Sequence, residues 1–266
     1  MRTIGLIGAG NLGTHISKLF HRNHVNNYVN VYDIDHNRSS RLSKKYGFTA
    51  YQNLPDMVED SDVIFLTVKP DCVKDICEEL NNDIYDNKII ISTAAGVPVS
   101  KIDEWSGNYH VVLRCMPNLP ISVGKGTIIW YGDERRYKII DISMVGPQSY
   151  WVDDEELVDV ATVISGCIPA YITKFYQAYL NAGIDMGFTP NMTKRMLLNA
   201  MYGTTQLLER MGPKDIIEQV ASKGGATEKG LELFEKMGFD NMVNTSSYQS
   251  LDRIRKITKK ITEDLD

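Results

Sequence analysis

The stretch that decides the fold is TIGLIGAGNLG, residues 3–13. It opens as a short apolar run from Thr3 to Ile7 and ends in three glycines, after which apolar residues recur at helical spacing as far as Leu19 and Phe20. A short apolar run suits a buried strand, and the change to a period of three and four residues indicates an amphipathic helix. The stretch therefore predicts a strand, a tight turn and a helix in direct succession.

The three glycines have the spacing G-x-G-x-x-G. Gly8 permits a tight turn, Gly10 lets a pyrophosphate approach the backbone, and Gly13 lets the helix pack closely on the strand. A purely structural turn is the alternative, but a strand before the glycines and a helix after them are the context of a dinucleotide site. The residues predicted to bind the cofactor here are Gly8, Ala9, Gly10, Asn11, Leu12 and Gly13.

An acidic residue, Asp33, ends a second strand-like run at residues 28–32. A carboxylate at this place can accept hydrogen bonds from the adenosine ribose and repel a 2′-phosphate. The sequence thus favours NADH over NADPH and predicts that Asp33→Ser improves the use of NADPH. Two alternatives stay open, namely Asp33 as an ordinary solvated residue, and a 2′-phosphate bound by Arg38 or Arg41.

Apolar runs separated by helical patterns continue through the first half of the chain. Strands that alternate with helices predict right-handed crossovers and a parallel sheet. We therefore predict an α/β fold with a doubly wound Rossmann sheet, and we assign residues 1–152 to a dinucleotide-binding domain. Further strands are expected near residues 48–50, 63–68, 89–92 and 111–114.

The pattern becomes helical after about residue 153, so we assign residues 153–266 to an all-helical domain. The boundary is expected at the acidic turn 152–156, where Asp153 or Asp154 could cap the incoming helix. Apolar faces recur on more sides of these helices than one small bundle needs, which predicts a homodimer or an assembly of dimers. One such face contains Leu157, Val160, Ala161 and Ile164.

Composition limits the function classes. The net charge of the 266 residues is −5 with acids and bases interspersed, so no basic face is available for nucleic acid. No apolar run approaches the roughly 18 residues of a membrane span, and the first is too short for a signal peptide. Cysteines and histidines lack the spacing of metal sites or disulfides, so we expect no metal, no membrane and a location in the reducing cytoplasm.

Two further glycine-containing stretches are candidate anion sites. Thr93-Ala94-Ala95-Gly96 follows a strand, and Ser222-Lys223-Gly224-Gly225-Ala226-Thr227 lies between two helical stretches. Glycines before a helix leave backbone N–H groups free to bind an anion. For the second stretch, a plain connection between two helices explains the pattern equally well.

Several segments resemble the pyrroline-5-carboxylate reductase family, in the family's own order along the chain. Arg114 with Met116-Pro117-Asn118 resembles its R-x-M-P-N-T-P segment, and Val68-Lys69-Pro70 resembles its V-K-P. Ser165-Gly166 with Pro169-Ala170-Tyr171 resembles its S-G-x-x-P-A-Y. The most specific match is Ser222 to Leu231, which is similar to its S-P-G-G-x-T signature.

The resemblance implies an enzyme of proline biosynthesis. Members of this family reduce 1-pyrroline-5-carboxylate to L-proline with NADPH or NADH, using a Rossmann domain and a helical dimerisation domain. The pyrroline nitrogen can be protonated before the hydride arrives, so positioning and one polar contact suffice. By similarity, the nicotinamide half of the cofactor lies along Val68, Lys69, Pro70, Ala94 and Ala95.

The resemblance also implies where the substrate binds. The substrate loop would reach the cofactor of the other subunit across an interleaved dimer. The Thr227 hydroxyl would contact the substrate ring nitrogen, and Asn118 would help to shape the hydride-transfer site. The implied substrate-binding residues are Ser222, Gly224, Gly225 and Thr227, and the implied catalytic residues are Thr227, Lys69 and Asn118.

Three positions depart from the family pattern. Leu119 replaces a threonine, Lys223 replaces a proline, and Ile168 replaces a small residue. These departures leave open a related cyclic imine or ketimine reductase and, from another class, a non-catalytic regulatory member of the family. A regulatory member is expected to lose the glycine turn or Thr227, and this chain has both.

Overall fold

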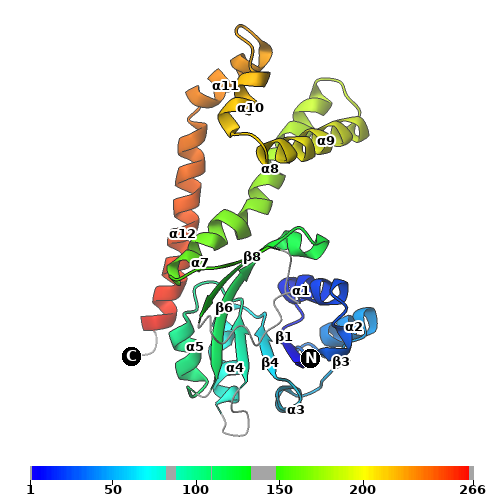
Figure 1. Ribbon diagram of the computed structural model, residues 1–266, viewed down its shortest axis with the longest axis vertical. Coiled ribbons are helices and arrows are strands. Elements are labelled where there is room, and N and C mark those ends of the chain that lie inside the picture. Colours follow the sequence, from blue (N-terminus) through cyan, green and yellow to red (C-terminus); the bar gives the residue numbers. More distant parts are fainter. Residues whose placement is uncertain (1, 82–87, 109, 133–147, 264–266) are drawn as a thin grey trace. The chain divides into compact units, whose positions relative to one another are not determined.

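The computed structural model describes residues 2–81, 88–108, 110–132 and 148–263 (Figure 1). The chain divides into two compact units, each described by itself below. We call Met1–Pro169 with Ser250–Asp266 the Rossmann unit, and Ala170–Gln249 the helical unit. By packing, the division thus falls after Pro169, whereas the sequence-based division at residue 152 follows the change from strands to helices.

The Rossmann unit contains one sheet in the order β3-β2-β1-β4-β5-β6-β7-β8. The strands from β3 to β6 pair in parallel, which confirms the predicted doubly wound sheet. β7 was not predicted and pairs antiparallel with β6, and β8 pairs parallel with β7. The strands are β1 (Ile4–Ile7), β2 (Val29–Tyr32), β3 (Thr49–Ala50), β4 (Val63–Leu66), β5 (Ile89–Ser92), β6 (Val111–Pro117), β7 (Thr127–Gly132) and β8 (Gln148–Trp151).

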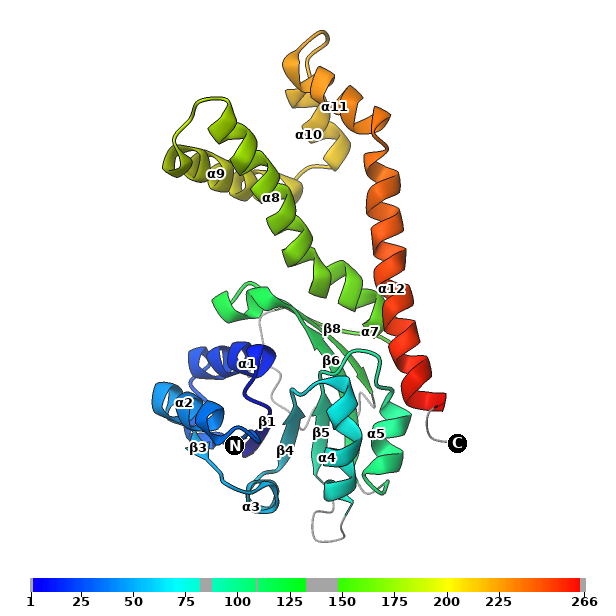
Figure 2. The same cartoon turned by 180° about the vertical axis from the view of Figure 1, so that it is seen from behind.

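Helices cover both faces of this sheet, as Figures 1 and 2 show from opposite sides. Side chains alternate along each strand, so that Val63 and Phe65 of β4 join one core while Ile64 and Leu66 join the other. The first core contains residues of α1 (Asn11–Arg22) and α2 (His36–Tyr46), and the second contains residues of α3 (Leu54–Glu59), α4 (Val73–Leu80) and α5 (Val99–Trp105). Burial on both faces explains why these strands are continuous apolar runs.

The chain leaves the sheet through α7 (Glu156–Ala161) and a π-helical segment, Thr162–Cys167. Asp154 accepts a hydrogen bond from the N–H of Glu156 at 2.9 Å, but the N-cap of α7 is Glu155, so neither of the two predicted residues is the N-cap itself. Val158 and Val163 are buried, whereas Leu157 and Ile164 are exposed. Val160 and Ala161 are half-buried, so the apolar face predicted from spacing is only partly covered by the residues that the structure describes.

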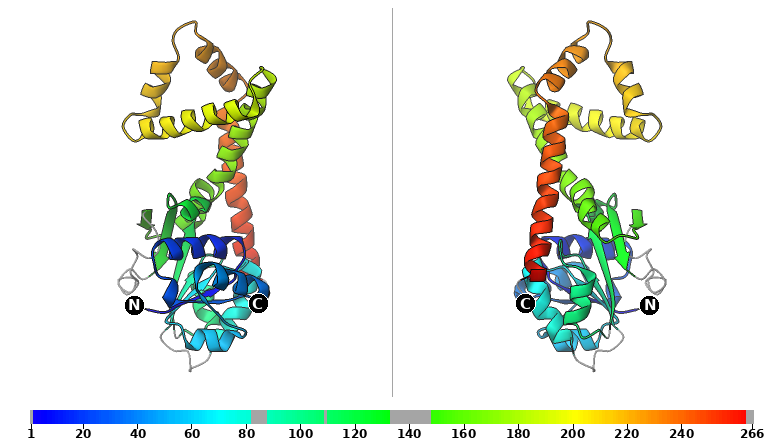
Figure 3. Two further views of the ribbon diagram at one scale, coloured as in Figure 1. Left: turned by 90° about the vertical axis from the view of Figure 1, so that its right-hand side faces the viewer. Right: turned by 90° about the vertical axis from the view of Figure 1, so that its left-hand side faces the viewer.

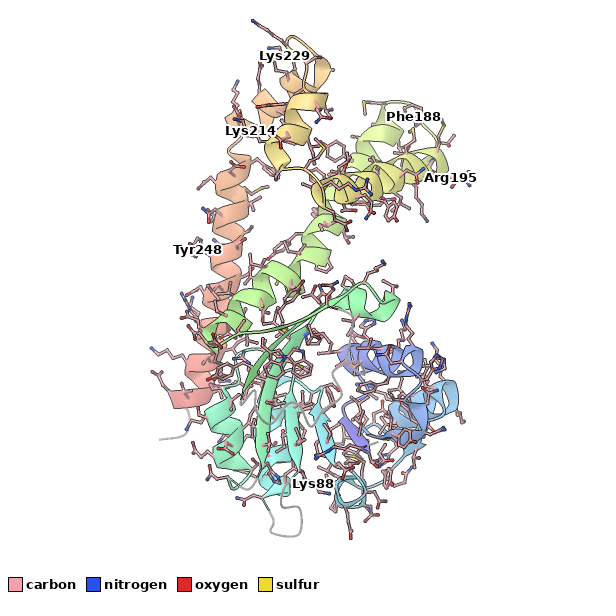
Figure 4. The ribbon with its side chains drawn as sticks, in the orientation of Figure 1. Lys88, Phe188, Arg195, Lys214, Lys229 and Tyr248 are labelled. Carbon is pink, nitrogen blue, oxygen red and sulfur yellow. The ribbon has the colours of Figure 1, made fainter. Side chains whose placement is uncertain are left out.

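The helical unit continues with most of α8 (Ile168–Asp185), followed by α9 (Pro190–Leu208), α10 (Pro213–Val220), α11 (Ala226–Lys236) and the first part of α12 (Phe239–Glu263). Figure 3 shows α9, α10 and α11 as sides of an open frame. Residues 170–249 are all described, and no apolar side chain among them is buried. In Figure 4 the side chains of Phe188 and Tyr248 extend from the ribbon, and both are exposed.

One helical segment, Glu156–Asp185, is long and apolar enough to cross a membrane, by length and composition alone. The sequence expectation of no membrane concerned uninterrupted apolar runs, and this composition alone does not contradict it. A few polar residues interrupt the run without lowering its mean hydropathy enough to exclude a span.

The last part of α12 belongs to the Rossmann unit, in contrast to the predicted all-helical domain 153–266. Ile254 is buried there, and Ile257 and the hydroxyl of Thr258 lie against Gly96. Gly96 has a φ of +74°, and a Cβ atom at Gly96 would lie 3.1 Å from the side chains of both residues. Gly96 of the Thr93–Gly96 stretch thus lies against α12. Packing on that helix explains why this position has no side chain.

Candidate active site

The glycine turn between β1 and α1 has a separate geometric reason for each glycine. Gly8 has a φ of +100°, a conformation that side chains rarely adopt. A Cβ atom at Gly13 would lie 2.0 Å from the carbonyl oxygen of Gly8, while one at Gly10 would meet no atom within 4 Å. The absence of a side chain at Gly13 therefore permits α1 to pack closely on the turn. At Gly10 it leaves the backbone surface of the turn open.

That open surface fits a pyrophosphate. Gly10 is the N-cap of α1 and makes no side-chain cap hydrogen bond, so the first N–H groups of a 12-residue helix remain available to an anion. The turn also lies at the carboxyl end of β1, next to β4, where the strand order reverses. Dinucleotides bind at this point of a doubly wound sheet.

Residues that follow β1, β4, β5 and β6 come to this same edge, because these strands are neighbours and parallel. The structure thus brings together the predicted cofactor residues of three segments. Val68 packs beside Gly8, Lys69 is exposed, Ala94 is buried and Ala95 is half-buried. The segments are Gly8–Gly13, Val68–Pro70 and Ala94–Ala95.

Thr67 is a residue of this edge that the sequence analysis missed. Its buried hydroxyl group donates to the carbonyl oxygens of Ile7, at 2.9 Å, and Gly8, at 2.6 Å. It therefore ties the end of β4 to the glycine turn. A hydroxyl residue directly after an apolar strand is too common a pattern to reveal this contact.

Asp33 is buried rather than solvated. Its Oδ2 accepts the N–H of Ala9 at 2.6 Å, and its Oδ1 accepts the N–H of Asp35 at 2.9 Å. The carboxylate thus joins the end of β2 to the glycine turn. This geometry rejects the alternative of an ordinary solvated side chain and gives Asp33 a role in shaping the turn.

Asn118 follows β6 and has both ends of its amide engaged. Its Oδ1 accepts the N–H of Thr127 at 2.9 Å, and its Nδ2 donates to the hydroxyl of Ser165 at 3.0 Å. Ser165 lies in the π-helical segment, and such segments are frequent at functional sites because they redirect side chains. These contacts make Asn118 a positioning residue that connects β6 to the helix.

Arg114 of β6 forms a buried ionic cluster with α7. Its side chain is 2% exposed; Nη1 lies 3.2 Å from Glu155 Oε1, and Nη2 contacts Asp159. Glu155 Oε1 also accepts the N–H of Val99 at 2.8 Å, so the cluster joins β6, α7 and the start of α5. Burial raises the pKa of the neighbouring Cys115 thiol, so this strand brings no thiolate to the edge.

The loop Ser222–Thr227 lies in the helical unit, and the structure corrects the expectation that its glycine N–H groups are free. The N–H of Gly224 donates to Glu228 Oε2 at 2.7 Å, and that of Gly225 donates to the carbonyl of Ser222 at 2.9 Å. Glu228 was missed, although an acid in the first turn of a helix commonly bonds back to the preceding backbone. The N–H of Gly224 thus already binds a carboxylate.

Thr227 is exposed at the second position of α11, whose N-cap is Gly225 without a side-chain cap bond. The helix therefore does not depend on the Thr227 hydroxyl as a cap. Ser222 and Lys223 are exposed beside it. In the part of the chain that the structure describes, no group of His, Cys, Asp and Glu could hold a metal ion.

The Rossmann sheet, the open glycine turn and the side chains along its edge define an oxidoreductase that uses a nicotinamide dinucleotide. Two family models match the chain. Residues 3–96 match the family described as NADP oxidoreductase coenzyme F420-dependent, and residues 155–257 match the one described as pyrroline-5-carboxylate reductase dimerisation. Over its C-terminal part the chain is thus similar to the pyrroline-5-carboxylate reductase family.

Whole-length relatives agree with this assignment. The pyrroline-5-carboxylate reductase of Pseudomonas aeruginosa is 28% identical and that of Glycine max 27%, over 97% and 96% of both chains respectively. The solved structure of a pyrroline-5-carboxylate reductase from Coxiella burnetii has a TM-score of 0.84 at 26% identity, covering 97% of this chain and 98% of that one. These relatives thus match the chain across both of its units and over nearly their own whole length.

Proposed function

We propose that this chain transfers a hydride from NADH or NADPH to the C=N bond of 1-pyrroline-5-carboxylate and forms L-proline, a step of proline biosynthesis. The observation that carries the proposal is the open glycine turn at the carboxyl edge of the sheet, in a chain that aligns over 97% of its length with reductases of that name. The nicotinamide dinucleotide, when bound, supplies the hydride. The chain supplies binding and positioning.

Residues of the Rossmann unit would hold the dinucleotide. The N–H groups at the start of α1, beyond Gly10, face the pyrophosphate, and the remaining lone pairs of Asp33 accept ribose hydroxyls. Lys69 and Ala95 line the edge towards the nicotinamide. Asn118, through its hydrogen bond to Ser165, holds the end of β6 against the π-helical segment beside them.

Residues of the Ser222–Thr227 loop would hold the substrate. The N–H groups at the start of α11 bind the substrate carboxylate, which replaces Glu228 on the N–H of Gly224. The Thr227 hydroxyl contacts the ring nitrogen and holds the C=N bond in place. Because protonation of the nitrogen activates the imine, this site needs no strong acid.

Parallel assays with three substrates test the reaction. Oxidation of NADH and NADPH is followed with 1-pyrroline-5-carboxylate, pyrroline-2-carboxylate and piperideine-2-carboxylate. We expect turnover with the first. A second candidate is a related ketimine reductase. It is favoured by two exposed residues that depart from the family pattern, Leu119 and Lys223. Fastest turnover with one of the two 2-carboxylates would establish this candidate. Turnover with none of the three contradicts both.

Thr227→Ala should lower kcat/KM for 1-pyrroline-5-carboxylate by about ten- to a hundredfold, the effect of one hydrogen bond lost in a desolvated site. NADH affinity and the melting temperature should barely change, because Gly225 and not Thr227 is the N-cap of α11. Thr227→Ser keeps the hydroxyl and should keep most of the activity. Unchanged turnover in Thr227→Ala, with a lowered melting temperature, would refute the assignment.

We further propose an obligate homodimer built on the helical unit. Exposed large apolar side chains, among them Met242 at 59%, occur on all its helices, and none of its apolar side chains is buried. A unit without a buried core does not fold on its own, so these faces require a second surface. The match of residues 155–257 to a dimerisation family supports a second copy of this chain as that surface.

Light scattering of the purified protein should show a dimer or a multiple of it, and dilution should unfold the chain without a stable monomer. The apolar helix Glu156–Asp185 then lies in the interface and needs no lipid. The protein should therefore remain in the supernatant after ultracentrifugation without detergent. A stable, active monomer, or recovery only from the membrane pellet, would contradict the dimer.

Two finer points belong to the same proposal. A negative charge in the segment that follows β2 favours NADH as the preferred cofactor. The four cysteines are all free thiols, which supports a location in the reducing cytoplasm.

A further inference from the structure

The two carboxylates that follow β2 differ in their surroundings. Asp33 is 7% exposed, and both of its oxygens accept backbone N–H groups, one of them from Ala9 inside the glycine turn. Removal of this side chain would leave those donors without their acceptor and loosen the turn that every dinucleotide must use. Asp33 therefore supports binding of NADH and NADPH alike.

Asp35 is the N-cap of α2, and its side chain is 44% exposed. One oxygen accepts the N–H of Asn37 at 3.2 Å, and the other lies 3.2 Å from Nε of Arg38. A helix N–H group and a guanidinium are the donors with which proteins commonly bind phosphate. The carboxylate of Asp35 thus occupies donors that a phosphate would use.

We propose that Asp35 determines the cofactor specificity of this chain: its carboxylate stands where a 2′-phosphate would bind at the start of α2, and so selects NADH. The inference rests on the proposed function, because it concerns the dinucleotide of that reaction. A 2′-phosphate meets a negative charge and finds Arg38 already paired. NADH brings only hydroxyl groups to this position and meets no such repulsion.

Titration calorimetry with the full-length protein tests the inference without turnover. The wild type should bind NADH more tightly than NADPH. Asp35→Ser keeps a good capping residue for α2 while it removes the charge and releases Arg38. The ratio of the NADPH dissociation constant to the NADH dissociation constant should fall at least about tenfold, the scale of one charge-assisted hydrogen bond.

Three further variants locate the effect. Adding Arg38→Ala to Asp35→Ser should return the ratio towards that of the wild type, because the released guanidinium is gone. Asp33→Ser should weaken both dinucleotides and leave their ratio unchanged, in contrast to the gain with NADPH that the sequence alone predicts. Asp56→Ser, which removes an exposed acid from the first turn of α3, is the matched control and should change neither constant.

An unchanged ratio in Asp35→Ser overturns the inference, and so does a wild type that prefers NADPH. A double variant that still binds NADPH as well as Asp35→Ser also overturns it. Failure of the proposed function has another signature, in which both dinucleotides bind and neither is oxidised by 1-pyrroline-5-carboxylate.

Discussion

Replacement of Arg114 by leucine is expected to destabilise the Rossmann unit by about 3 to 5 kcal/mol, because it leaves the carboxylates of Glu155 and Asp159 without the cation between them. Asp159 is buried, and Glu155 also holds the N–H of Val99, so neither can turn to solvent without loosening the junction of β6, α7 and α5. The shift in the urea midpoint, at fixed protein concentration, measures the loss.

The chain contains a matched control for this variant. Arg255 pairs with Glu156 in the same unit, but the two side chains are 57% and 55% exposed. Arg255→Ala should therefore cost less than about 1 kcal/mol. The combined change Arg114→Met, Glu155→Gln and Asp159→Leu should recover most of the stability, because it removes all the buried charges together. Equal losses from Arg114→Leu and Arg255→Ala would show that burial does not govern the cluster.

Gly13→Ala and Gly10→Ala should separate the folding role of the glycine turn from its binding role. At Gly13 a Cβ atom would lie 2.0 Å from the carbonyl oxygen of Gly8, so the turn must shift, at a cost of about 1 to 3 kcal/mol. NADH affinity should fall with it, by about tenfold or more. At Gly10 a Cβ atom meets no atom within 4 Å, so stability should stay within about 0.5 kcal/mol of the wild type.

Gly10→Ala should nevertheless weaken NADH by about tenfold, because the new methyl group projects into the space through which the pyrophosphate approaches the backbone. Thermal unfolding and NADH titration on the same preparations compare the two variants. If Gly10→Ala binds NADH as the wild type does, the pyrophosphate does not lie against Gly10, and the placement of the cofactor at this turn is wrong.

Local spacing explains what could be predicted. The first six strands, the glycine turn and the place of Asp33 depend on residues close together in the chain, and all are found where the pattern indicated. β7 was missed because no helix separates it from β6, so the alternation of strands and helices does not include it. β8 was missed since its side chains are only partly buried and its pattern is weak.

The sequence by itself determined the fold class, the family resemblance and the positions at which the cofactor and the substrate are expected to bind. The tertiary structure alone decided which contacts the side chains make. It buries the carboxylate of Asp33 on the N–H of Ala9, packs α12 against Gly96, and places Arg114 between Glu155 and Asp159. The physical reason is that hydrogen bonding, burial and charge pairing join residues far apart in the chain, and local pattern carries no record of those partners.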